Sequence, residues 1–201
     1  MPLAPSRPEG SDLGSVPAAE SPLAERDAGG NRFRRGQSIH ALLQHLPALP
    51  AAARRDAAVR FLDRPGLGLA AGEAGRIADE VLAVMAHPDL MPLFGPDSRA
   101  EVPLTGVVGD SAIGGLVDRL AVLPDRVLVA DFKTNRRPPV RMQDTPILYL
   151  RQMASYRAVL RAIFPGRRVE CALIWTREAR VTILPDEMLD PHEPGHAPHA
   201  A

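Results

Sequence analysis

Residues 114–137 have the sequence GGLVDRLAVLPDRVLVADFKTNRR, and this stretch decides which fold we expect. Two apolar runs of strand length, residues 116–123 and 126–132, flank a Pro-Asp turn, which predicts a hairpin whose strands are covered on both faces. Three charged residues interrupt these runs or follow them directly: Asp118, Asp131 and Lys133. A buried charge in a sheet is costly unless it is paired or binds a metal ion. The stretch therefore predicts a functional site within the sheet.

The position of the turn determines which residues of the hairpin face each other. A turn centred on Pro124 and Asp125 places Asp118 opposite Asp131, with their Cβ atoms about 5 Å apart. Lys133 follows two positions after Asp131 and therefore points to the same face of the sheet. The hairpin thus brings two carboxylates and one ammonium group together.

Two carboxylates at that separation repel each other, and one takes up a proton unless a divalent cation lies between them. Hard oxygen ligands with few nitrogens favour Mg²⁺, or Mn²⁺, over zinc. Beside the cation, protonated Lys133 would stabilise charge developing on a phosphate or orient an attacking water. This pattern indicates metal-dependent phosphodiester hydrolysis. The alternative is that Asp118 with Arg119, and Asp131 with Lys133, form ordinary ion pairs at a sheet edge.

The rest of the chain predicts helices on both sides of a strand region. Apolar residues at helical spacing predict helices at residues 34–46, 51–62, 75–86 and 147–164. Runs of strand type predict further strands at residues 101–108, 169–176 and 181–184. Between the first of these strands and the hairpin we expect a loop or hairpin tip at residues 110–114. This order predicts a mixed α/β domain with a central sheet flanked by helices.

Four residues outside the hairpin are candidates for the site. His40 lies beside the apolar stripe of its helix, and from the helix alone a structural histidine is the better interpretation. Glu101 is either an exposed carboxylate at a strand end or an acid belonging to a metal site. Gln152 and Tyr156 are four positions apart and therefore neighbours on the surface of the long helix.

Composition predicts one domain between two tails. Residues 1–33 are rich in Pro, Ser, Ala and Gly with few large apolar residues, which predicts a disordered tail or linker. Residues 34–190 form the domain, and residues 191–201 a disordered tail. The histidines of that second tail are expected to be solvated rather than to form a metal site: His192, His196 and His199.

Charge and cysteine content exclude several classes of protein. Lys plus Arg and Asp plus Glu both number 24, so no net field attracts the chain to nucleic acid or to a membrane. The single cysteine, Cys171, excludes an internal disulfide framework, a cysteine zinc site and an iron–sulfur cluster. No apolar run approaches the ~18 residues of a membrane-spanning helix, and no signal peptide is recognisable. We expect a soluble, cytoplasmic protein.

The motifs occur in an order that resembles the PD-(D/E)XK nuclease superfamily. Asp118 is followed by Asp131-Phe132-Lys133, and then by Gln152 and Tyr156. Five stretches are also similar to the C-terminal nuclease domain of AddA, the helicase–nuclease subunit of bacterial AddAB repair complexes: RRGQSIHALLQHLP, GGLVDRLAV, VADFKTNRRPP, YLRQMASYRAVL and ALIWT. The resemblance extends over about residues 34–189 and implies a restriction-endonuclease-like core, a central mixed sheet flanked by helices.

The resemblance also implies roles for individual residues. His40 becomes a metal ligand, which replaces its structural interpretation. Asp118 and Asp131 become the metal-binding aspartates, with the backbone carbonyl of Phe132 as a further ligand, and Lys133 becomes the catalytic lysine. Three residues become accessory residues beside the active site, where the first two help to position DNA and the third has no fixed role: Gln152, Tyr156 and Glu101.

Two departures from the AddAB pattern limit what this chain does alone. AddB-type nuclease domains carry four cysteines, so the likeness is to AddA only. The sequence has no G-x-x-x-x-G-K-[ST] phosphate loop, so we expect no ATP site and no helicase activity in this chain. It would be a piece of a larger subunit or a separate nuclease domain.

The resulting expectation is a Mg²⁺-dependent nuclease, with Mn²⁺ as the alternative metal. It would degrade single-stranded DNA in recombinational repair together with a helicase motor and an AddB-like subunit, without membrane contact. Two alternatives stay open. The chain could be a DNA-binding module that is inactive without its motor and partner, or a nuclease of phage or CRISPR type.

Overall fold

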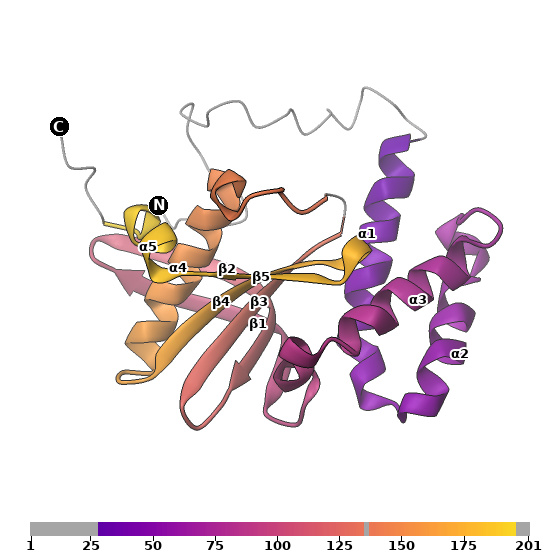
Figure 1. Cartoon of the computed structure of the whole chain (residues 1–201), viewed down its shortest axis with the longest axis horizontal. Coiled ribbons are helices and arrows are strands. Elements are labelled where there is room, and N and C mark those ends of the chain that lie inside the picture. The colour runs from indigo at the N-terminus through magenta and orange to yellow at the C-terminus, as the bar shows by residue number, and fades with distance from the viewer. Residues whose placement is uncertain (1–27, 135–136, 196–201) are drawn as a thin grey trace.

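The computed structural model describes residues 28–134 and 137–195 and shows one five-stranded sheet in the order β1-β2-β3-β4-β5 (Figure 1). The strands are β1 (Ser98–Val108), β2 (Ser111–Val122), β3 (Arg126–Lys133), β4 (Arg168–Trp175) and β5 (Arg180–Leu184). Neighbouring strands are antiparallel except β3 and β4, which are parallel. The sheet is therefore mixed, as predicted, with β3 at its centre. β1 lies at one edge of the sheet, the position where a strand tolerates a proline such as Pro103.

Helices cover both faces of this sheet. The α-helices are α1 (Ala28–His45), α2 (Ala51–Leu62), α3 (Glu73–Met85), α4 (Ile147–Ile163) and α5 (Asp186–Leu189). Short 3-10 helices complete the chain: η1 (Leu46–Ala48), η2 (Pro65–Leu67), η3 (Pro88–Phe94), η4 (Met142–Asp144), η5 (Thr176–Glu178) and η6 (Asp190–His192). One apolar core joins α1–α3 to one sheet face, and a second joins α4 and α5 to the other (Figure 1). These two layers confirm the predicted α/β class.

The central hairpin has the predicted register. β2 pairs with β3 from Arg119 opposite Ala130 to Val122 opposite Val127. This is the register that the turn predicts, and the ladder ends one step before Asp118 and Asp131, whose direct opposition stays a prediction. All residues of β3 between its first and last are buried, which confirms a strand covered on both faces. β3 is central, so Asp131 and Lys133 do not lie at a sheet edge as the ion-pair alternative supposed, although they do form an ion pair.

Two sequence-based boundaries were wrong. The predicted loop at 110–114 is mostly strand, because β2 begins at Ser111 and the turn lies at Gly109, whose φ is 57°. The first helix begins at Ala28 rather than at residue 34. Residues 1–27 and 196–201, including His196 and His199, lie outside the described residues, while His192 ends η6. The predicted domain limits remain predictions.

Two glycines let α4 approach the sheet closely. A Cβ atom at Gly115 of β2 would lie 2.7 Å from Cε1 of Tyr156, and one at Gly106 of β1 would lie 2.8 Å from Cγ1 of Val159. Real side chains do not tolerate such contacts, so both positions need glycine. No helix in the described part of the chain is long and apolar enough to cross a membrane.

Candidate active site

The site begins where strands β2 and β3 separate. Their ladder ends at Arg119 and Ala130, and the next backbone N–H of β3 facing this gap, that of Phe132, donates to Oδ2 of Asp118 at 2.7 Å. A side-chain carboxylate thus replaces a ladder carbonyl. A charge-assisted bond of this kind orients the carboxylate firmly. The gap also lets a side chain of α1 approach Asp118 although α1 packs with the helices of the other sheet face.

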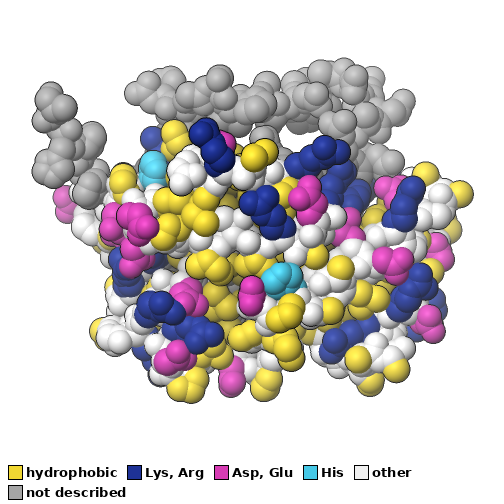
Figure 2. All heavy atoms as spheres, viewed as in Figure 1, with side chains coloured by type: hydrophobic (Ala, Val, Ile, Leu, Met, Phe, Trp, Pro, Cys, Tyr) yellow, Lys and Arg dark blue, Asp and Glu magenta, His cyan; other side chains and the backbone are white. Residues whose placement is uncertain are grey.

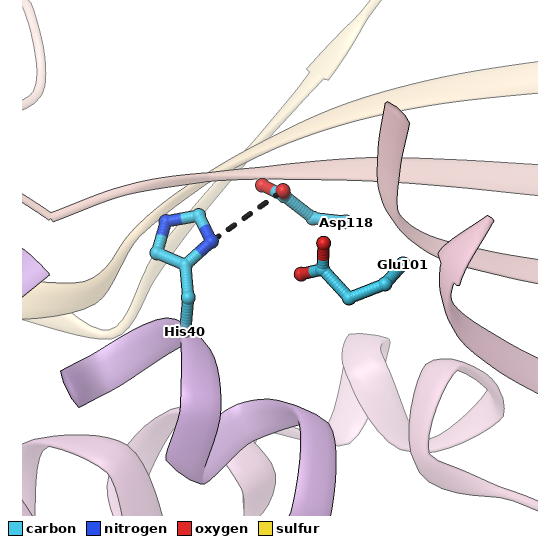
Figure 3. A group of neighbouring side chains, drawn as sticks. All are labelled: His40, Glu101 and Asp118. Atoms are coloured by element: carbon cyan, nitrogen blue, oxygen red, sulfur yellow. Dashed lines mark ion pairs between the residues drawn. The ribbon is translucent and has the colours of Figure 1, made fainter. Parts of the chain in front are cut away.

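Three side chains from three elements converge beside this gap (Figure 3). His40 of α1 places Nδ1 3.4 Å from Oδ1 of Asp118 on β2, and Glu101 of β1 points toward both. One ligand atom from each residue lies within 4.8 Å of the others. Two carboxylates and one imidazole form a donor set that suits a divalent cation of the Mg²⁺ or Mn²⁺ type. His40 therefore lies beside Asp118, one of the two aspartates with which the resemblance groups it.

Glu101 reaches this cluster through an unusual backbone conformation. The β1–β2 register runs from Ala100 opposite Arg119 to Val102 opposite Val117, and it leaves Glu101 unpaired across from Asp118. The φ of Glu101 is 51°, a left-handed value that costs roughly 1–3 kcal/mol in a residue with a side chain. Strain of this kind in mid-strand favours the metal-site interpretation of Glu101 over that of an exposed strand-end acid.

Asp131 and Lys133 form a second group next to the first. Lys133 Nζ lies 2.6 Å from Oδ2 of Asp131 and donates to Oε1 of Gln152 at 3.1 Å. The same ammonium lies 3.8 Å from the ring centroid of Tyr149, a cation–π contact. Asp131 therefore pairs with Lys133 and does not belong to the cluster of His40 and its neighbours. The predicted grouping of Asp131 with Lys133 on one face is confirmed.

Gln152 and Tyr156 support the lysine from α4. The Gln152 amide donates to the Tyr156 hydroxyl at 3.3 Å, and that hydroxyl donates to the Leu116 carbonyl at 2.9 Å. Tyr156 is 0% exposed and Gln152 9%. Tyr156 is therefore enclosed by protein and cannot contact a ligand directly, while its hydroxyl holds the Gln152 amide. Tyr149 was missed from the sequence, although its spacing from Gln152 and Tyr156 puts all three on one helix face.

Two arginines hold α1, and with it His40, against the sheet. Arg119 donates through Nη2 to the backbone carbonyls of Leu43 at 2.7 Å and Gln44 at 3.3 Å, in the last turn of α1. These carbonyls have few partners within the helix, so a cation there is favourable. Arg119 is thus bound to the helix and not to Asp118, and the proposed Asp118–Arg119 ion pair is wrong.

The second anchor lies on the other side of His40. Arg35 donates through Nη1 to the backbone carbonyl of Thr134 at 3.0 Å, directly after Lys133, and forms an ion pair with Glu80 of α3. Thr176 Oγ1 in turn donates to Oε1 of Glu80 at 2.5 Å. This network ties α1 to the end of β3. Because its members come from four elements, only the folded chain reveals it.

Burial and neighbouring charges change the pKa values of the ionisable side chains in the site. Burial raises the pKa of Asp131, against the attraction of Lys133. Burial and the charge of Asp118 raise the pKa of Glu101. Burial lowers the pKa of His40, but the hydrogen bond and charge of Asp118 outweigh it and leave that pKa raised. Excess negative charge thus accumulates here, a condition that a bound cation would relieve.

Lys133 also stands out in the amino-acid composition. It is the only lysine in the chain, and the other basic residues among the 24 of Lys plus Arg are arginines. Arginine therefore serves at every surface position where either residue would do. An ammonium retained at one buried position indicates a need for its compact shape and donor geometry.

The comparisons with known proteins agree with this geometry. A sequence model of the family described as the PD-(D/E)XK nuclease superfamily matches residues 18–188. No curated protein matches the chain. A solved structure from Eubacterium rectale, named "Putative exonuclease", aligns with a TM-score of 0.51 at 11% identity, covering 81% of this chain and 62% of that one. This chain thus spans less than two thirds of that protein.

A second solved structure, named SSO0001, aligns over 76% of this chain and 74% of its own at 18% identity. Its TM-score of 0.33 is too low to support an argument about fold or function. The family match covers most of the sequence and includes every candidate site residue from His40 to Tyr156. With the mixed sheet and the cluster of acids around Lys133, it establishes that the chain belongs to the PD-(D/E)XK nuclease superfamily.

Proposed function

We propose that the chain is a divalent-metal-dependent deoxyribonuclease acting on single-stranded DNA. The observation that carries this proposal is the adjacency of two groups, His40 with Glu101 and Asp118, and Asp131 with Lys133. One group offers cation ligands, and the other offers a positive charge held at a fixed position. Phosphodiester hydrolysis by a nuclease requires both.

The donor set fits the cation that this superfamily uses. His40, Glu101 and Asp118 would hold it, and Asp131 and the Phe132 carbonyl are proposed as further ligands from β3. When bound, the cation supplies Lewis-acid polarisation of the phosphate and eases deprotonation of water near neutral pH. Mg²⁺ is the proposed ion and Mn²⁺ the alternative, since both prefer oxygen ligands.

The chain's own residues place and stabilise the reacting phosphate. Lys133 keeps its ammonium between Asp131, Gln152 and the ring of Tyr149, so no reorganisation is needed when charge develops on a phosphate oxygen. A water oxygen forms a bond to phosphorus while the P–O bond to one sugar oxygen breaks. The attacking water gives up a proton to solvent, and the leaving sugar oxygen takes up a proton from solvent to become a hydroxyl.

The test is cleavage of a labelled single-stranded oligonucleotide by the purified chain with Mg²⁺, Mn²⁺ or EDTA. Cleavage should need the cation and should be abolished in Asp131→Ala and Lys133→Ala. Asp125→Ala, in the exposed turn of the same hairpin, is the matched control and should cleave normally. Wild-type activity in both site variants would refute the proposal. Salt-dependent DNA binding without cleavage by the wild type would favour the inactive DNA-binding module.

We also propose that the domain works with a helicase motor and an AddB-like subunit in recombinational repair. The five stretches similar to AddA and the lack of a phosphate loop in this sequence support that assignment. Co-purification of the tagged chain from its native cells, followed by identification of bound proteins, tests it. Recovery with phage or CRISPR proteins instead would assign the nuclease to another branch.

A further inference from the structure

One side of α1 borders a cavity that extends from the candidate cation ligands to residues without a role in the proposed chemistry. The cavity has a volume of about 460 Å³, within the range of small-ligand sites. Its wall on α1 includes Phe33, Gln37, His40 and Gln44, whose spacing places them on one helix face. These residues span about 16 Å of helix at 1.5 Å per residue. Glu101 also lines the cavity, so it opens directly onto the candidate cation ligands.

Phe33 is far more exposed than the large apolar residues further along α1. Its side chain is 65% exposed, whereas Ile39 and Leu43 of the same helix are 0% exposed. Phe33 is therefore not part of the core. It lies about 10 Å along the helix from His40, seven residues away. An exposed aromatic ring at this distance from the reacting phosphate is placed to meet a neighbouring nucleotide.

The polar lining of the cavity is neutral apart from the site residues. The side-chain amides of Gln37 and Gln44 make no hydrogen bond to the described residues, so within that part of the chain both can bind a ligand. Among the described residues of the lining, the ionisable groups are His40 and Glu101. A neutral lining with an aromatic ring suits a base and sugar better than a phosphate, which the Lys133 group would attract.

The outer surface also argues for a local contact. Basic side chains on the face in Figure 2 are interspersed with acidic ones and do not form a continuous basic track. The net charge of the whole chain is zero. Broad electrostatic attraction therefore contributes little to DNA affinity, and stacking has to contribute more.

We propose that this cavity is a nucleotide subsite in which Phe33 stacks on one unpaired base of the DNA strand, next to the scissile phosphate. The inference rests on the proposed nuclease function and specifies its substrate. A base in a duplex is already stacked and paired, whereas an unpaired base has a free face for Phe33. Because every base has such a face, the subsite selects single strands without reading their sequence.

The first test separates binding from chemistry. Phe33→Ala should raise KM for a single-stranded oligonucleotide about 10-fold, the size expected for one lost base–aromatic stack, and change kcat less than about 2-fold. Phe33→Trp should restore KM. Met91→Ala removes a side chain of similar exposure, 67%, that does not line the cavity, and should leave KM unchanged. Equal melting temperatures of the variants exclude a folding defect.

The second test asks whether the partner of Phe33 is a base. Oligonucleotides with one abasic position, moved step by step along the strand, are bound to proteins carrying Lys133→Ala so that no cleavage occurs. One position should lower affinity about 10-fold when Phe33 is present and hardly at all in Phe33→Ala. If an abasic position lowers affinity equally in both proteins, the subsite proposal is wrong. Phe33 would then be a candidate for contact with another protein.

The two proposals fail in different ways. If the wild type cleaves DNA and Lys133→Ala does not, but Phe33→Ala behaves as wild type, the subsite is wrong and the nuclease stands. If no divalent cation supports cleavage, the nuclease proposal is wrong, while the abasic experiment still measures stacking by binding alone.

Discussion

Two basic side chains that protein largely encloses belong to or border helix α4, and they differ in where the excess negative charge around them lies. Arg157 of α4 is 0% exposed and contacts Asp186, Asp190 and Glu193 at 2.5, 2.6 and 2.7 Å. These acids are partly exposed and lie in or after α5, so the cluster fastens the end of the chain onto α4. Every donor direction of the guanidinium is used, and the remaining negative charge faces water.

At Lys133 the arrangement is reversed. One buried ammonium faces Asp131, and Asp118 and Glu101 lie nearby on the side of the open cavity. The negative excess here is enclosed by protein, where water compensates it less well. Burial of a charge therefore does not by itself distinguish function from structure. What distinguishes the two clusters is where the uncompensated charge lies and whether a ligand can reach it.

The largest expected effect is on catalysis at Lys133. Lys133→Ala should reduce cleavage at least ~100-fold, since it removes a preorganised charge from the transition state. Lys133→Arg tests the comparison of the two basic residues more sharply, because it keeps the positive charge. The larger, forked guanidinium suits the surroundings of Arg157 but not those of Lys133. We expect Lys133→Arg to be nearly as inactive. Initial rates on a labelled oligonucleotide measure both, and near-normal activity of Lys133→Arg would show that charge alone suffices.

Arg157→Ala should affect stability instead of chemistry. Removing one partner of a buried ion pair costs ~3–5 kcal/mol when a charge is left buried. Here the acids left behind can reach water, so we expect about 2–3 kcal/mol. Urea unfolding followed by the fluorescence of the only tryptophan, Trp175, measures it. Arg161→Ala, a half-exposed neighbour sharing two of the acids, should cost less than ~1 kcal/mol. Equal losses of unfolding free energy in Arg157→Ala and Arg161→Ala would contradict the difference between a buried and a half-exposed arginine.

Gly115→Ala tests the packing of α4, the helix that carries both Arg157 and the Lys133 partner Gln152. The new Cβ would meet the ring of Tyr156 at 2.7 Å, so α4 must move or the core must strain, at a cost of ~1–3 kcal/mol. Gln152 moves with it, and cleavage should fall together with stability. Gly114→Ala is the matched control, because its Cβ would make an ordinary contact at 3.9 Å to Thr105. Thermal melts and rates that do not differ between these variants would refute this packing argument.

The smallest predicted effect is a pH dependence of cation affinity. The raised pKa of His40 reflects its pairing with Asp118, which outweighs burial. Without a cation, this pair stabilises the fold fully below the ordinary histidine pKa of about 6.5 and ceases to do so as pH rises through the raised value. A ligating imidazole must be neutral, so Mn²⁺ affinity should fall by up to about tenfold per pH unit below that value. Calorimetric titrations at several pH values measure this slope, and His40→Ala should flatten it.

Local rules were enough to predict the central hairpin. A Pro-Asp turn and a side-chain period of two residues determine the register, and they correctly placed Asp131 beside Lys133, whereas Asp118 groups with His40 and Glu101. The helix face carrying Gln152 and Tyr156 follows from the helical period in the same way. Recognition of the superfamily then led to His40, which its own helix would not have distinguished.

The remaining parts depend on tertiary structure. The φ of Glu101 is held by the surrounding sheet and no local pattern encodes it. The Arg35–Glu80 network joins α1 to α3 across 45 positions of sequence, and arginine and glutamate on surface helices are too common to signal a pair. The need for glycine at position 115 arises from the close packing of α4 against β2, which no local pattern encodes.

A chain with one lysine has one side-chain amine, and that amine lies in the candidate active site. Reagents that acylate or reductively methylate amines would modify only Lys133 and the N-terminal α-amine, so labelling kinetics would report on the site without mutation. A ¹³C-methyl group introduced in this way would give one NMR probe between Asp131 and Tyr149. In a cell, lysine acetylation would have a single possible side-chain target in this sequence, and it would remove the charge on which the proposed chemistry depends.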